Sequence, residues 1–152
     1  EQHLVSLFIE LNLSELGIHD YDKVGPLNVF AGHLAHIQTQ YKIPRSLLDG
    51  KEGKFIASLH PTPAVCGLPK ADAYMMILKA EQHQRRYYTG FLGPWKLKDQ
   101  SQLFVNLRCA ELGDGMINLY VGGGLTSLSN PEDEYKETVD KSKTLLSVVE
   151  NL

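Results

Sequence analysis

Turn signals between apolar segments in the second half of the chain constrain the fold more than any other feature. Gly93-Pro94 separates residues 87–92 from residues 102–110, and Gly113-Asp114-Gly115 separates residues 102–110 from residues 116–121. Strands joined by such short connections pair in opposite directions, whereas parallel strands need a long crossover. The three segments therefore predict an antiparallel meander.

The first part of the chain predicts a helix followed by two short strands. Apolar residues at helical spacing indicate an opening helix that ends near Gly17. Residues 27–30 and 33–40 predict strands, and Pro44 ends the second. The apolar positions of the opening helix are Leu4, Leu7, Phe8, Leu11 and Leu13.

Two further helices complete the predicted architecture. Residues 60–69 contain three prolines, which exclude regular structure. Residues 70–84 have helical periodicity, and residues 131–151 predict a closing helix with Asn130 as its N-cap and Pro131 in its first turn. The order of elements predicts one α+β domain, with an antiparallel sheet and flanking helices, and argues against a Rossmann fold.

Charge and cysteine content exclude several classes of function. Fifteen Lys and Arg residues against eighteen Asp and Glu residues give a net charge of −3. No basic field is therefore available to hold nucleic acid or an anionic membrane surface. No apolar run approaches the roughly 18 residues that a membrane span requires. Cys66 and Cys109 form no CxxC pair, and we interpret them as reduced thiols of a cytoplasmic protein.

The closing helix carries the clearest candidate for a site. Glu134, Glu137 and Lys141 are spaced i, i+3 and i+7, so they share one helix face. One interpretation is a solvated face with a single Glu-Lys pair. The other is a pair of carboxylates for Mg²⁺ beside an ammonium group for an anionic substrate.

Three consecutive glycines, Gly122, Gly123 and Gly124, follow the last predicted strand. Glycine allows a backbone to approach a ligand closely and to offer N–H groups to a carboxylate. The segment lacks the spacing of a P-loop or a dinucleotide-binding loop. A flexible exit from the strand is the alternative interpretation.

Tyr88 and Arg108 are expected on neighbouring strands. An arginine on a strand face needs an acidic partner, and a substrate carboxylate fits its planar fork. A surface arginine on an edge strand is the alternative. His33 and His36 are three residues apart in a predicted strand, which directs them to opposite faces and argues against a shared metal site.

Five ordered segments that span nearly the whole chain resemble the chorismate-utilising enzymes, and among them the isochorismate synthase branch. The match includes the residues after His60-Pro61 and continues to the closing helix. Its segments are His60-Pro61-Thr62-Pro63-Ala64-Val65-Cys66-Gly67-Leu68-Pro69, Arg86-Tyr87-Tyr88-Thr89-Gly90, Asn106-Leu107-Arg108-Cys109-Ala110-Glu111-Leu112, Leu119-Tyr120-Val121-Gly122-Gly123-Gly124-Leu125 and residues 129–141.

The resemblance implies a magnesium site. Glu1 and Glu137 match the family's magnesium carboxylates, and Glu134 matches a residue that holds a metal-bound water. Lys141 matches the lysine that meets the ring carboxylate of the substrate. Mg²⁺ is therefore the expected cofactor.

The resemblance also implies a substrate site for chorismate. Tyr88 and Arg108 match the pair that receives the enolpyruvyl carboxylate. His33 matches an active-site histidine near the departing hydroxyl group. Gly122, Gly123 and Gly124 match the backbone that lines the ring carboxylate.

The branch of the family that we expect for this chain is inferred from Ala64. Pro63-Ala64 is similar to the isochorismate synthases, in which water is the nucleophile, whereas salicylate-forming members tend to have threonine where Ala64 stands. An anthranilate or salicylate synthase, or a domain that binds a dicarboxylate without converting it, remains the alternative. Whether the pathway leads to menaquinone or to a siderophore stays open.

Residues 1–152 are expected to form the C-terminal portion of a chorismate-binding catalytic domain. The family's catalytic base and acid, a lysine and a glutamate, match no residue here and would lie in an N-terminal portion that this sequence lacks. We therefore expect the 152 residues alone to be inactive. We also expect them to need the missing half or to self-associate.

Overall fold

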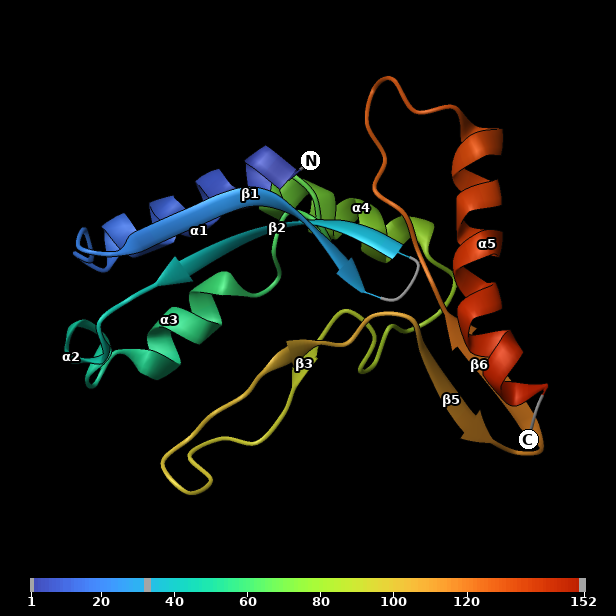
Figure 1. Cartoon of the computed structure of the whole chain (residues 1–152). Helices are drawn as coiled ribbons and strands as arrows, with labels where there is room; N and C mark the ends of the chain where they lie inside the picture. The colour runs from blue at the N-terminus through green and yellow to red at the C-terminus, as the bar shows by residue number, and fades with distance from the viewer. Residues whose placement is uncertain (1, 32–33, 151–152) are drawn as a thin grey trace. The chain divides into compact units, whose positions relative to one another are not determined.

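The computed structural model describes residues 2–31 and 34–150, which divide into two compact units (Figure 1). Unit 1 comprises Glu1–Tyr74 and unit 2 comprises Met75–Leu152. Helix α4 (Lys70–Ala80) contains the boundary and is shorter than the predicted helix over residues 70–84. No helix of the described part of the chain is long and apolar enough to cross a membrane.

Unit 1 contains an antiparallel two-stranded ribbon and several helices, the first of which contacts the ribbon. The ribbon pairs β1 with β2, and Gly25 interrupts its register at φ +113°. A Cβ atom on Gly25 would lie 2.5 Å from the carbonyl oxygen of Gln38, so the close strand approach requires glycine. The elements of the unit before α4 are α1 (Gln2–Glu15), β1 (Asp22–Ala31), β2 (Leu34–Lys42), α2 (Arg45–Leu48) and α3 (Glu52–Leu59).

Polar contacts attach α1 to the ribbon. The Glu10 carboxylate accepts hydrogen bonds from Lys23 Nζ at 2.6 Å and from the Tyr41 hydroxyl at 2.8 Å. The bond from Lys23 lowers the pKa of Glu10. Leu13, at the end of α1, and Ile18, just beyond it, are completely buried and form the core of this unit.

Unit 2 contains two separate strand pairs and a long closing helix. β3 pairs with β4, β5 pairs with β6, and α5 packs against β6. Its elements after α4 are β3 (Phe91–Leu92), β4 (Phe104–Val105), β5 (Cys109–Gly113), β6 (Met116–Tyr120) and α5 (Pro131–Val149).

The prediction of antiparallel pairing is confirmed, but the continuous three-stranded meander is wrong. The predicted strand over residues 102–110 is divided into β4 and β5. Asn106 exchanges backbone hydrogen bonds of 2.8 and 2.7 Å with Thr89 and Gly90, and Arg108 has a φ of +48°. The left-handed backbone at Arg108 is incompatible with an extended strand and separates the two pairs.

The described residues leave large apolar side chains exposed on every strand pair. Phe30 of β1 is 75% exposed and Leu112 of β5 is 77% exposed. A two-stranded sheet is marginally stable alone, and exposed apolar patches mark surfaces that contact other protein. Each unit therefore has exposed apolar sheet faces to which other protein segments can bind.

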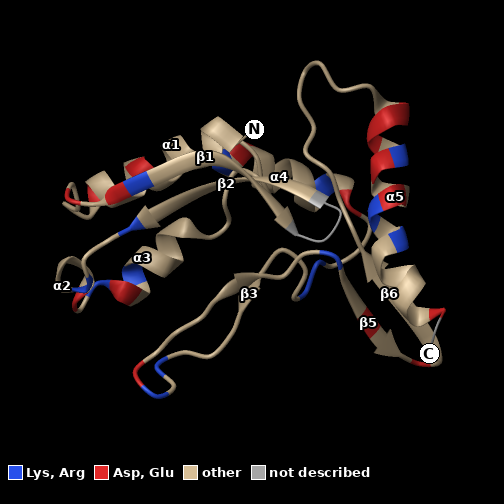
Figure 2. Ribbon diagram, viewed as in Figure 1, with Lys and Arg blue, Asp and Glu red and all other residues tan. Residues whose placement is uncertain are grey.

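The first turn of α5 is capped as predicted. The Asn130 side-chain oxygen accepts hydrogen bonds from the backbone N–H groups of Glu132 and Asp133, at 3.0 and 3.2 Å. Figure 2 shows acidic residues, in red, at this end of α5, where their charge complements the helix dipole. The cap fixes the residue at which the helix begins, and so fixes which residues share its faces.

Replacing Asn130 by Ala is expected to lower the free energy of unfolding by about 1 kcal/mol, because two N–H groups lose their acceptor. Urea denaturation followed by circular dichroism measures the change. Asn130→Asp keeps the acceptor and is expected to remain within a few tenths of a kcal/mol of wild type. Equal losses in both variants would contradict a capping role.

Candidate substrate and metal site

The predicted acidic and basic face of α5 is present in the structure. Lys141 Nζ lies 2.6 Å from a Glu137 carboxylate oxygen, one helical turn away. One turn before Glu137, Glu134 accepts a 2.6 Å hydrogen bond from the Ser129 hydroxyl. The side chain of Glu137 is about half exposed, whereas that of Lys141 is 23% exposed. Glu137 is therefore open to a ligand, and Lys141 is partly enclosed.

Lys141 and Glu134 both lie against the glycine segment. Lys141 Nζ donates a 3.1 Å hydrogen bond to the carbonyl oxygen of Gly122. A Cβ atom on Gly123 would lie 3.3 Å from Glu134 Oε2. The fold thus brings together two groups of predicted site residues that are separated in the sequence.

The Tyr88 hydroxyl lies against the same segment. A Cβ atom on Gly122 would be 2.6 Å from that hydroxyl, so only glycine fits there without displacement. The Tyr88 ring also contacts the ring of Tyr120, with centroids 5.7 Å apart. Burial raises the pKa of Tyr88, which keeps the hydroxyl protonated as a hydrogen-bond donor. Tyr88 lies in a turn before β3, not in the strand that the sequence predicts.

Arg108 immediately precedes β5 and lies outside the strand on which it was expected. Arg108 precedes Cys109, whose strand partner Tyr120 lies two residues before the glycine segment in the sequence. Arg108 makes no hydrogen bond or ion pair with another described residue, whereas Arg85 and Arg86 are paired with Glu81 and Glu111. Arg108 is therefore available to an anionic ligand.

The donor set on α5 is suited to Mg²⁺. This ion is usually held by one or two carboxylates, with water or substrate oxygens completing an octahedron. Glu134 and Glu137 provide two carboxylates one turn apart on the same helix face. Within residues 2–31 and 34–150, no group of three or more His, Cys, Asp or Glu side chains could hold a metal ion. A magnesium ion held by Glu134 and Glu137 would therefore need substrate or water oxygens to complete its coordination.

The contacts described above do not include several other predicted residues. Glu1 and His33 lie outside the described residues. Ala64 belongs to unit 1, where it is exposed in a turn that follows His60-Pro61. Gly124 is exposed in the loop between β6 and α5.

Sequence reasoning missed His36, which lines a cavity of about 320 Å³ between α1 and β2. Gln2, which follows the predicted ligand Glu1 in the sequence, lines the same cavity and donates a 2.9 Å hydrogen bond to Thr39. Strand alternation predicted opposite faces for His33 and His36, but no pattern in the sequence indicates that His36 lines a cavity.

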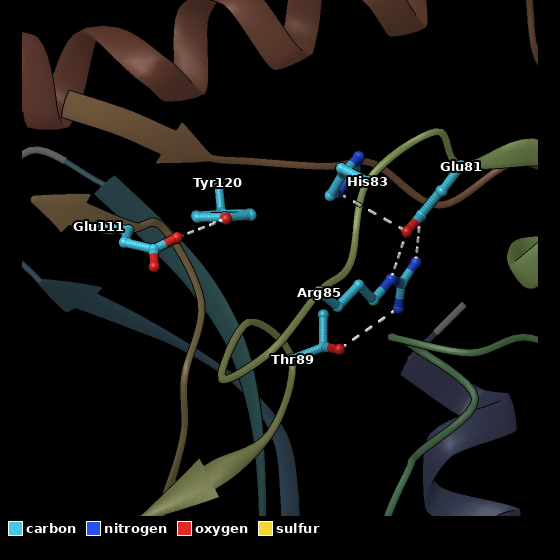
Figure 3. A network of polar contacts seen from close by, with 6 residues as sticks. All are labelled: Glu81, His83, Arg85, Thr89, Glu111 and Tyr120. Atoms are coloured by element: carbon cyan, nitrogen blue, oxygen red, sulfur yellow. Dashed lines mark hydrogen bonds and ion pairs between the residues drawn. The ribbon is translucent and has the colours of Figure 1, made fainter. Parts of the chain in front are cut away.

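A second missed feature is the polar network around Arg85 (Figure 3). Its guanidinium makes two hydrogen bonds to Glu81, which lies just beyond the end of α4. The network holds the pKa of the Glu81 carboxyl below its usual range, chiefly through the bond from Arg85. The i, i+4 spacing of Glu81 and Arg85 was a detectable signal.

Comparison with known proteins identifies the family. The sequence matches the chorismate binding enzyme family model over residues 1–150. The chain therefore belongs to the chorismate-binding enzyme family, and its α+β architecture with small antiparallel sheets is that of part of such a domain.

The similar relatives represent two activities. The vibriobactin-specific isochorismate synthase of Vibrio cholerae is 42% identical over 91 residues, which are 60% of this chain and 23% of that protein. An isochorismate synthase of Bacillus subtilis is 42% identical over 90 residues, 59% of this chain and 23% of that protein. A probable anthranilate synthase component 1 of Schizosaccharomyces pombe is 28% identical over 139 residues, 90% of this chain and 28% of that protein. The chain spans about a quarter of the length of these relatives.

Gly122→Ala is expected to displace the Tyr88 hydroxyl, because the added Cβ would lie 2.6 Å from it. NMR of the chain with labelled tyrosine should show a changed Tyr88 ring resonance. Gly113→Ala is the matched control, since nothing lies within 4 Å of a Cβ there. An unchanged Tyr88 resonance in Gly122→Ala would show that the two groups are not in contact.

Proposed function

We propose that the chain is the C-terminal portion of a Mg²⁺-dependent isochorismate synthase. On this proposal, water adds to the chorismate ring beside the carboxylate-bearing carbon, and the ring hydroxyl across the diene leaves. The observation that carries the proposal is the position of Lys141 Nζ, 2.6 Å from Glu137 and 3.1 Å from the Gly122 carbonyl oxygen. The Glu137 carboxylate, proposed as a metal ligand, the Lys141 ammonium and the Gly122 backbone thus lie together. This combination suits the binding of a substrate carboxylate.

Arg108 and Tyr88 are proposed to bind the enolpyruvyl carboxylate. The guanidinium group offers a two-bond fork, and the protonated hydroxyl adds a third donor. Lys141, with the N–H groups of Gly122 to Gly124, is proposed to bind the ring carboxylate. To do so, Lys141 would direct one of its three N–H donors to substrate while keeping its bond to the Gly122 carbonyl.

Glu134 and Glu137 are proposed to hold Mg²⁺, with Glu1 as a further carboxylate. When bound, the ion supplies positive charge that neutralises the ring carboxylate and orients it. Glu134 is oriented by the bond from Ser129, which leaves its Oε2 facing Gly123. His33 is proposed to lie near the departing hydroxyl group, and Ala64 beside the ring.

The isochorismate synthase activity is favoured over an anthranilate synthase by the more similar relatives and by Pro63-Ala64. Two isochorismate synthases are 42% identical to the chain, against 28% for the anthranilate synthase component. The anthranilate synthase component matches more of the chain, so ammonia-dependent chemistry is the competing proposal.

The test is product analysis with chorismate and Mg²⁺, with and without ammonium, using the complete polypeptide of which these residues would form the C-terminal portion. Chromatography and mass spectrometry should show isochorismate in both conditions. Anthranilate formed only with ammonium would establish the competing activity. Salicylate would indicate that the product goes on to lose pyruvate, and binding without turnover would indicate a non-catalytic domain. Residues 1–152 alone are expected to form no product.

Glu137→Gln is expected to raise the Mg²⁺ concentration needed for half-maximal turnover by roughly tenfold to a hundredfold, because an amide is a poorer ligand for a hard cation. Glu132→Gln, in the exposed first turn of the same helix, is the control and should leave the requirement unchanged. An unchanged Mg²⁺ titration in Glu137→Gln would place Glu137 on an ordinary solvated face.

Arg108→Lys is expected to lower kcat/KM for chorismate by about 30-fold, or about 2 kcal/mol, because an ammonium group lacks the planar fork. Arg45→Lys, at an exposed position of α2, is the matched control and should behave as wild type. Steady-state kinetics measure both. Wild-type kinetics in Arg108→Lys would remove Arg108 from the substrate site.

A further inference from the structure

We propose that the Glu81–Arg85 ion pair is a positioning device for Tyr88, and that it directs the Tyr88 hydroxyl toward the enolpyruvyl carboxylate of the substrate. The assignment of that carboxylate rests on the proposed function. The contact between the ion pair and the tyrosine does not depend on it.

The guanidinium of Arg85 is held from two sides (Figure 3). Nε and NH2 donate to the two oxygens of Glu81 at 2.8 and 2.5 Å, which is a bidentate contact. NH1 lies 3.3 Å from the Thr89 hydroxyl. A planar group bonded along both edges has little freedom to rotate. The Arg85 guanidinium is therefore held in one orientation, unlike the mobile side chain of an unpaired arginine on the protein surface.

The Arg85 guanidinium lies against the ring of Tyr88. The centre of the Arg85 guanidinium is 5.7 Å from the centroid of the Tyr88 ring, within range of a cation–π contact. Tyr120 also contacts the ring, and its own hydroxyl is bonded to Glu111 at 2.9 Å. The Tyr88 ring is thus held by two neighbours, each fixed in turn by a carboxylate.

The backbone beside Tyr88 points to the same role. Thr89 is buried and has a φ of +61°, a conformation that a β-branched residue rarely adopts. It is maintained by the 2.8 Å bond from the Thr89 N–H to the Asn106 carbonyl and by the contact from Arg85. Because Thr89 is held on both sides and directly follows Tyr88, it restricts the backbone from which the Tyr88 side chain projects.

Arg85 itself is a poor candidate for binding the substrate. Glu81 neutralises its charge, and His83 Nε2 lies 3.8 Å from the same carboxylate. The side chains of Arg85 and Glu81 are each about one quarter exposed, so the pair is partly enclosed. Its effect on substrate is therefore expected to pass through Tyr88.

The first experiment measures the contact without substrate. The complete polypeptide is labelled with ¹³Cζ-tyrosine, and the Tyr88 resonance is assigned by its loss in Tyr88→Phe and followed with pH. The Arg85 cation lowers the pKa of Tyr88, against the effect of burial. Arg85→Gln should therefore shift the resonance and raise the pKa, and Arg85→Lys should keep the pKa nearer to wild type.

Lys143→Gln is the matched control for this titration. It removes an equally short ion pair, to Asp140 on the exposed face of α5, and should leave the Tyr88 resonance unchanged. Circular dichroism verifies that each variant keeps its helix content. An Arg85→Gln variant that is folded and has the wild-type Tyr88 resonance and pKa would overturn the proposal.

The second experiment separates positioning from general stability in the complete polypeptide. Glu81→Gln is expected to raise KM for chorismate about tenfold, with a smaller change in kcat, and to add little when Tyr88 is already Phe. If the effects of Glu81→Gln and Tyr88→Phe on KM were fully additive in the double variant, the proposal would also be overturned. A wild-type protein that does not convert chorismate, but shows the Tyr88 shift in Arg85→Gln, would overturn the proposed function and support the contact.

Discussion

The bond from Lys141 to the Gly122 carbonyl oxygen is the contact on which the site in unit 2 depends. It joins the closing helix to the loop that leaves β6, at 3.1 Å. Because Lys141 also pairs with Glu137 at 2.6 Å, the same ammonium group fixes where the helix carboxylate lies relative to the glycines. The Tyr88 hydroxyl is set by the same loop, since Gly122 leaves it room.

The part of this site that lies on α5 could be predicted from the sequence. Helical spacing placed Glu134, Glu137 and Lys141 on one face, and Asn130 indicated the residue at which the helix begins. Both predictions depend only on local periodicity and on hydrogen bonding within one turn, and the structure confirms both. The antiparallel pairing of the strands was predictable for a similar reason, because short connections permit little else.

The environments of Tyr88 and Arg108 could not be predicted in this way. Alternating residues suggested one strand over residues 102–110, but Asn106 exchanges hydrogen bonds with residues 89 and 90, and the chain then turns away at Arg108, whose φ is +48°. These contacts join segments some 17 residues apart, and no local pattern reveals them. The contact of Arg85 with Tyr88 likewise arises from tertiary packing, although the Glu81–Arg85 spacing itself was visible in the sequence. Glu1 and His33 remain predictions from resemblance.

The distribution of charge is consistent with the proposed binding of a substrate with two carboxylates. Among the described residues near Tyr88, Arg85 and Arg86 are compensated by Glu81 and Glu111, so neither adds net attraction for an anion. Arg108 has no acidic partner in the described part of the chain, and Lys141 shares a carboxylate that Mg²⁺ would also bind. Binding of the ion at Glu137 would draw that carboxylate from Lys141 and free the ammonium for substrate. Two cationic groups, Arg108 and Lys141, would then be available, one for each carboxylate of the proposed substrate chorismate.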